Sequence, residues 1–177
     1  VLSAYFTMAV VRIKAGAPDA LKIEIDWHLW ALLGISTTAL VGTPLILSTK
    51  KSKEPVPNEV AKAAAMLNES PADVDANRQG ILYANPNQAD ARFTDIFSGD
   101  ELKNTAHVDL AKVQMFFFTV IAAFAYCVML FNSFVAAKGD PAALARLPAL
   151  PDGMIAILGI SHAGYLTSKG IDRTKTS

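Results

Sequence analysis

Cysteine, histidine and charge are all scarce in this 177-residue chain. It has one cysteine, Cys127, three histidines and 18% charged residues, whereas soluble domains have about 25% charged residues. A single cysteine excludes an intrachain disulfide framework, and Cys127 is interpreted as a small apolar residue. Because 16 basic residues balance 16 acidic ones, a basic nucleic-acid-binding surface is disfavoured and no nucleic-acid partner is expected.

Catalytic signatures are also missing from the sequence. The chain contains no GxGxxG, P-loop, GxSxG or HExxH motif, and its histidines and cysteine lack the spacing of zinc ligands. We therefore expect a protein that is not an enzyme, with no metal and no cofactor. His28 and His107 lie near the ends of apolar segments, where we expect solvated or interfacial positions.

Long segments without charge dominate what is present. Residues 115–137 form 23 consecutive uncharged positions, and as a helix rising about 1.5 Å per residue they cross the roughly 30 Å core of a bilayer. Residues 27–48 contain no Asp, Glu, Lys or Arg, begin with two tryptophans suited to a membrane interface, and include Pro44, which is expected to bend or loosen the helix. Residues 150–168 form a shorter third candidate span.

An internal repeat relates these segments. Leu-Gly-Ile-Ser occurs at 33–36 and again at 158–161, an offset of 125 residues. The same offset places the connector 12–26 on 137–151 and the uncharged N-terminal residues on the second half of the 115–137 run. We therefore predict an all-α, polytopic membrane protein of two tandem helical hairpins with about four spans, the first one truncated at its start.

Both copies of the repeat carry small residues at helical positions i, i+4 and i+8. Such residues form one smooth stripe on a helix and let another helix approach closely. The six predicted packing positions are Gly34, Thr38, Gly42, Gly159, Ala163 and Thr167.

The two Leu-Gly-Ile-Ser helices, the Asp-Leu-Ala-Lys-Val-Gln-Met segment at 109–115 and the ending LGISHAGYLTSK at 158–169 resemble a group of uncharacterised multi-pass bacterial membrane proteins. The resemblance implies a location in the bacterial inner membrane and implies no particular chemistry. The first copy departs from the pattern, because Thr-Thr-Ala and Pro44 replace the His-Ala-Gly-Tyr and Lys positions of the second copy.

These boundaries divide the chain into a first hairpin at 1–48, a polar insert at 49–108 and a second hairpin at 109–177. Basic residues near the span ends favour a cytoplasmic insert and C-terminus. The insert has a predicted helix near 58–67, started by Pro57 and ended by 68–71. In residues 91–97, Phe93, Ile96 and Phe97 share one helical face, which predicts docking on lipid, on the chain itself or on a partner.

Four residues are candidates for a polar or cofactor site: His162, Ser36, Ser161 and Tyr165. His162 is the ionisable residue deepest in an uncharged run, a position that favours function by default, although helix-to-helix hydrogen bonding is the simpler role. The leading hypothesis is a non-catalytic membrane subunit or scaffold whose partners are the bilayer and other membrane subunits or copies of itself. Two alternatives stay open: an oligomeric channel or transporter component, and an electron-transfer or photosynthetic accessory subunit that binds a cofactor through His162.

Overall fold

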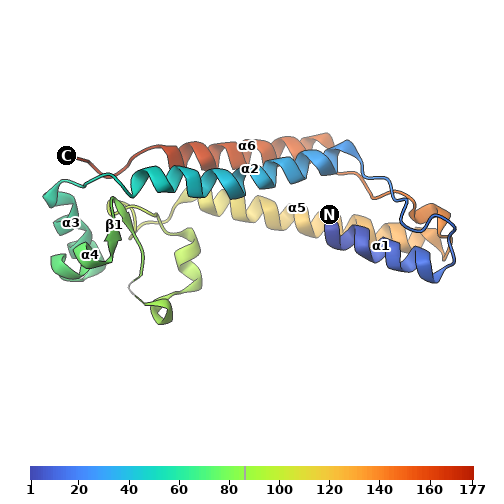
Figure 1. Ribbon diagram of the computed structural model, residues 1–177, viewed down its shortest axis with the longest axis horizontal. Helices are drawn as coiled ribbons and strands as arrows, with labels where there is room; N and C mark the ends of the chain where they lie inside the picture. Colours follow the sequence, from blue (N-terminus) through green and yellow to red (C-terminus); the bar gives the residue numbers. More distant parts are fainter. Residues whose placement is uncertain (86) are drawn as a thin grey trace. The chain divides into compact units, whose positions relative to one another are not determined.

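The computed structural model describes residues 1–85 and 87–177, and within these residues the protein is predominantly helical (Figure 1). This confirms the predicted all-α class, to which the insert adds one small hairpin. The α-helices are α1 (Leu2–Lys14), α2 (Trp27–Lys50), α3 (Pro57–Leu67), α4 (Pro71–Asn77), α5 (Leu110–Ala137) and α6 (Asp152–Gly170). The short elements are β1 (Arg78–Gln79), β2 (Leu82–Tyr83) and the 3₁₀ turns η1 (Gln88–Asp90), η2 (Phe93–Phe97) and η3 (Ala142–Leu144).

Two helices, α2 and α5, are long and apolar enough to cross a membrane. They have 24 and 28 residues and coincide with the two longest charge-free segments of the sequence. The third candidate span is also helical, as the 19-residue α6, but the count of four spans remains a prediction. Helix α2 continues through Pro44 to Lys50.

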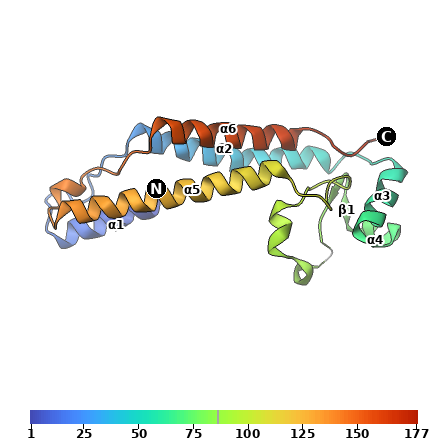
Figure 2. The same ribbon diagram turned by 180° about the vertical axis from the view of Figure 1, so that it is seen from behind.

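The chain forms two compact units. The first contains residues 1–37 and 117–160, and the second contains residues 38–116 and 161–177, so that α2, α5 and α6 each contribute to both. In the first unit, α1 and the second half of α5 lie side by side (Figures 1 and 2). The core of the first unit includes Met8, Leu29 and Leu147, all fully buried.

The connectors that follow α1 and α5 in the first unit pair with each other in parallel. The amide of Glu24 donates to the carbonyl of Ala145 at 2.8 Å, and the amide of Leu147 donates to the carbonyl of Glu24 at 3.0 Å. The buried guanidinium of Arg12, at the end of α1, donates to backbone carbonyls of both connectors, among them Pro141 at 2.6 Å. Since each connector leads into a helix, these bonds hold the first turns of α2 and α6 in the same orientation.

The second unit contains the insert. Helix α3 begins at Pro57, as predicted, and ends where Asn68 adopts a left-handed conformation with φ of 58°. The chain then enters α4, which the sequence interpretation missed, and the Ser70 hydroxyl caps it by accepting the amide of Asp73 at 3.1 Å. The buried side chains of this small core are Ala63, Ala64, Val74, Tyr83 and Leu102.

The β1–β2 hairpin attaches the insert to the end of α2. The Ile81 amide donates to the Lys50 carbonyl at 3.2 Å, and the Leu102 amide donates to the Ile81 carbonyl at 3.0 Å. The hairpin turns at Gly80, where φ is +61° and an added Cβ would collide with the backbone of Lys50 and Lys51. Glycine is therefore required at this position by both conformation and space.

Candidate functional site

The predicted packing residues divide between contacts inside the chain and open positions. A Cβ at Gly42 would meet Leu166 of α6 at 3.3 Å, and a Cβ at Gly159 would meet Ile35 of α2 at 3.7 Å. A Cβ at Gly34 would meet nothing within 4 Å. The other three positions, Thr38, Ala163 and Thr167, are exposed. Each stripe therefore has one glycine at a contact between α2 and α6, and the rest of each stripe is exposed.

Three of the four predicted polar-site residues lie on the buried face of α6. Ser161, His162 and Tyr165 are 4%, 8% and 8% exposed, whereas Ser36 is exposed on α2. The Thr43 hydroxyl donates to the Ala39 carbonyl at 2.8 Å and lies 3.5 Å from the Tyr165 hydroxyl, which can donate to it. The contact of Tyr165 with Thr43 is a helix-to-helix hydrogen bond of the kind expected in an apolar environment, whereas the buried Ser161 hydroxyl has no hydrogen-bond partner among the described residues.

A buried ion pair joins the end of α2 to the insert. The Lys50 ammonium lies 2.5 Å from Glu101 Oε1, and both side chains are less than 5% exposed. The other carboxylate oxygen of Glu101 accepts the amides of Arg173 and Thr174 at 2.8 and 2.7 Å. Glu101 therefore holds the C-terminal residues that follow α6 against the end of α2.

A second ionic group lies beside this pair, around Asp100. Its carboxylate pairs with Lys169 of α6 and with Lys112 of α5, the latter at 2.7 Å. Lys112 also donates to the Ser98 carbonyl at 2.6 Å, and Asp109 lies 3.6 Å from Lys169. We name Lys50, Asp100, Glu101, Asp109, Lys112 and Lys169 the ion cluster.

Sequence reasoning missed the ion cluster. It counted the lysines among the basic residues near the span ends and assigned no site to Asp100 or Glu101. The sequence contained a signal for it. All three lysines lie at the ends of apolar runs, and the Asp-Glu pair lies in the segment that precedes one of these runs. No local pattern indicates, however, that residues so far apart in sequence become paired and buried.

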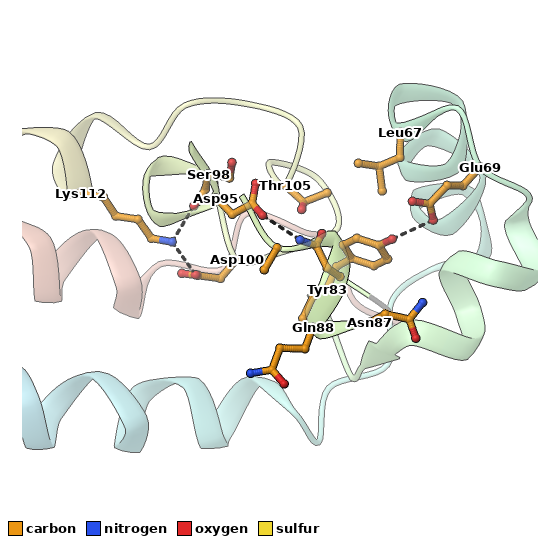
Figure 3. Close-up of a pocket in the computed structure, with 14 residues that line it drawn as sticks. Leu67, Glu69, Tyr83, Asn87, Gln88, Asp95, Ser98, Asp100, Thr105 and Lys112 are labelled. Atoms are coloured by element: carbon orange, nitrogen blue, oxygen red, sulfur yellow. Dashed lines mark hydrogen bonds and ion pairs between the residues drawn. The ribbon is translucent and has the colours of Figure 1, made fainter. Parts of the chain in front are cut away.

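A polar cleft of about 470 Å³ adjoins the ion cluster in the insert (Figure 3). Its lining includes the carboxylates of Glu69, Asp95 and Asp100 and one cation, Lys112. Tyr83 crosses it and donates to Glu69 at 2.7 Å, and burial together with this carboxylate raises the pKa of Tyr83 to about 12. The excess of carboxylates favours cationic or donor-rich molecules, although each carboxylate already has a partner in the protein.

Asp95, in the same cleft, is positioned by its own turn. Its carboxylate accepts the backbone amide of Arg92 and the side-chain amide of Asn85, each at 2.7 Å. Both bonds lower the pKa of Asp95, the bond from the Arg92 amide more than the bond from Asn85. The Asp95 carboxylate thus lines the cleft, whereas the side chains of its neighbours Phe93 and Ile96 are 67% and 50% exposed.

A third polar group lies in the first unit, where His28 connects α2 to α6. One imidazole nitrogen contacts Asp26, the other lies 2.5 Å from Asp152, and the Trp27 ring centroid is 4.0 Å from that of His28. Asp26 also accepts the backbone amide of His28 and pairs with Arg146 at 2.7 Å. The backbone bond, the imidazole and the guanidinium, in that order, lower the pKa of Asp26 to about 2. The His28 side chain is 16% exposed, which is less than a fully solvated position would leave it.

No other protein helps to interpret these groups, because no family model, curated protein or solved structure matches the chain. Within residues 1–85 and 87–177, no three His, Cys, Asp or Glu side chains are arranged to hold a metal ion. The Lys50–Glu101 pair, the group around Asp100 and the group around His28 share one geometric property. In each, the paired residues lie at the ends of different helices and in the loops beside them. Their shared physical effect is to fix helix ends and connectors in place.

Proposed function

We propose that this chain is a non-catalytic integral membrane subunit that packs against other membrane helices and presents its insert at the membrane surface. The insert and the C-terminus are placed on the cytoplasmic side, because the basic residues near the span ends are biased toward them. The two hairpins are proposed as tandem copies of one unit with the same orientation. The parallel pairing of their connectors supports this, and so does the start of α6, which lies 125 residues after the start of α2.

The first support for a membrane location is the apolar surface of α5. Six large side chains on this helix recur at alternating spacings of four and three residues, and each is 44–71% exposed: Phe117, Ile121, Phe124, Val128, Phe131 and Val135. Burying one such side chain contributes about 1.5–3 kcal/mol. Leaving six of them about half in water would cost on the order of 5–10 kcal/mol, which is comparable to the whole stability of a typical domain. The surface therefore requires a bilayer or other helices to cover it.

The observation that carries the subunit role is the open space beside Gly34. Lipid-facing helix surfaces have no need of small residues, whereas helix–helix contacts do, because small residues let two backbones approach. Gly42 and Gly159 already serve contacts inside the chain, but Gly34 has open space beside it. Its face is thus suited to a helix from another chain.

The experiment compares two glycines of the same stripe. Gly34→Leu adds a side chain whose Cβ would meet nothing within 4 Å, whereas Gly42→Leu places a large side chain against Leu166. After mild-detergent extraction from the native membrane, we expect wild type to migrate on a native gel with other proteins, which mass spectrometry of the band identifies. Gly34→Leu should release the chain from that band while its own thermal unfolding is unchanged, and Gly42→Leu should lower its thermal stability.

A Gly34→Leu variant that stays fully in the assembly would contradict the proposed packing face. A wild-type band that contains copies of this chain alone would contradict the role in a larger assembly and favour an oligomeric channel. Both results are read from the same gel, and the Gly42→Leu variant distinguishes loss of assembly from loss of folding.

A further inference from the structure

The aromatic residues of η2 lie beside the point where α5 becomes uncharged. The Phe97 ring packs edge-to-face on Phe116 with centroids 5.1 Å apart, and Phe93 does the same at 6.4 Å. Phe116 is the second residue of the charge-free run 115–137. The turn therefore lies against the membrane helix itself, although it belongs to the polar insert.

The position of η2 is fixed by bonds on both sides of the aromatic contact. The Asp109 amide, one residue before α5, donates to the Phe97 carbonyl at 2.7 Å. Lys112 in the first turn of α5 donates to the Ser98 carbonyl at 2.6 Å. Because both bonds hold the end of η2 to the start of α5, the exposed side chains of η2 are held at one level along that helix.

That level can be estimated from the helix rise. Lys112 is the last charged residue of α5, and Phe116 follows it by four residues, or about 6 Å along the axis. Interfacial elements bury their apolar side chains about 5–10 Å into the boundary between headgroups and acyl chains. Phe93 and Ile96, three residues apart, lie on the same side of a 3₁₀ turn and are 67% and 50% exposed. The carboxylate of the neighbouring Asp95 is instead bonded to the side chain of Asn85 and the backbone amide of Arg92.

We propose that η2 is a lipid anchor: Phe93 and Ile96 insert at the acyl–headgroup boundary and hold the insert against the membrane surface. The occupant is lipid because η2 packs on Phe116, at the level along α5 where the charges of that helix end. Exposed Arg92, immediately before them, is placed to meet lipid phosphates. This inference rests on the proposed membrane location of α5.

The test measures depth with nitroxide labels on the full chain in vesicles of phosphatidylcholine and phosphatidylglycerol. The native cysteine is first replaced, as Cys127→Ser, so that each variant carries one label. Ile96→Cys reports the anchor, and Thr94→Cys, exposed on the same turn, is the matched control. Phe124→Cys, 71% exposed on α5, reports the span. Phe93→Cys gives a second anchor probe.

We expect the label at Ile96 to collide with a water-soluble nickel chelate at least fivefold less often than the label at Thr94, and to collide readily with oxygen. If the Ile96 and Thr94 labels are equally accessible to nickel while Phe124 is protected, the anchor is overturned and the membrane location stands. Protection of Ile96 from both reagents would mean that protein covers it, which also overturns the anchor. Nickel access at Phe124 would overturn the anchor together with the membrane location.

Discussion

Replacing Glu101 with glutamine should release the C-terminal residues from the end of α2. Glutamine keeps the shape and an acceptor oxygen but removes the charge that faces the Lys50 ammonium at 2.5 Å. Removing one member of a buried ion pair costs about 3–5 kcal/mol, because the other charge is left without compensation. Asp172, 3.7 Å from Lys50 and about one-third exposed, compensates only in part.

The assay is hydrogen exchange of the C-terminal peptide in detergent, followed by mass spectrometry. The amides of Arg173 and Thr174 donate directly to Glu101, so their protection reports this site. Since every 1.4 kcal/mol is a tenfold change, Glu101→Gln should speed their exchange by roughly 10²–10³-fold or more. Adding Lys50→Met should restore part of the protection by removing the unpaired ammonium.

The matched control is Lys53→Ala. Lys53 pairs with Asp172 on the same C-terminal segment, but both side chains are more than one-third exposed. Exposed pairs contribute about 0–1 kcal/mol, so exchange should change by less than about fivefold. If Glu101→Gln and Lys53→Ala have the same small effect, burial of the ion cluster does not hold the C-terminal segment, and the reasoning fails.

Two further predictions concern the backbone and the acid limit of stability. Gly80→Ala should lower thermal stability clearly more than Gly139→Ala, because both glycines have positive φ but only Gly80 has backbone atoms where the Cβ would lie. The conformational term common to both is about 1 kcal/mol, and equal losses at the two positions would exclude the steric argument. The second prediction is based on the low pKa of Asp26, about 2 against an ordinary 3.8. Its contribution is complete above about pH 4 and is lost as pH falls toward 2. Asp26→Asn should therefore flatten the loss of stability between pH 4 and pH 2 in thermal unfolding, and an unchanged acid limb would contradict this assignment.

The helices were largely predictable from the sequence, because their signals are local. The charge-free runs became α2 and α5, and Pro57 marked the start of α3. Helix α4 was missed, because the Asn-Glu-Ser-Pro segment that ends α3 also begins α4, and a turn signal does not indicate which element comes next. The aromatic group at 93–97 was predicted on one helical face, and the structure makes it a 3₁₀ turn of five residues.

The candidate sites were predictable only in part. Ser161, His162 and Tyr165 are buried on α6, whereas Ser36 is exposed on α2 although it corresponds to Ser161 in the repeat. The small-residue stripes were visible in the sequence, but the pattern did not distinguish Gly42, which meets Leu166, from Gly34, which has open space. That distinction depends on where the neighbouring helix lies.

The sequence by itself determined that this protein has long apolar helices, because helix length and hydropathy depend on residues within a few turns of one another. Only the tertiary structure decided which charges are paired. Lys50, Glu101 and Arg173 are separated by more than 50 residues from one another in the chain. Each is a charged residue type that fits a solvent-exposed position as well as a buried pair. Burial of the Lys50–Glu101 pair results from the folding of the insert onto the ends of the helices, where a lysine removed from water requires a carboxylate beside it.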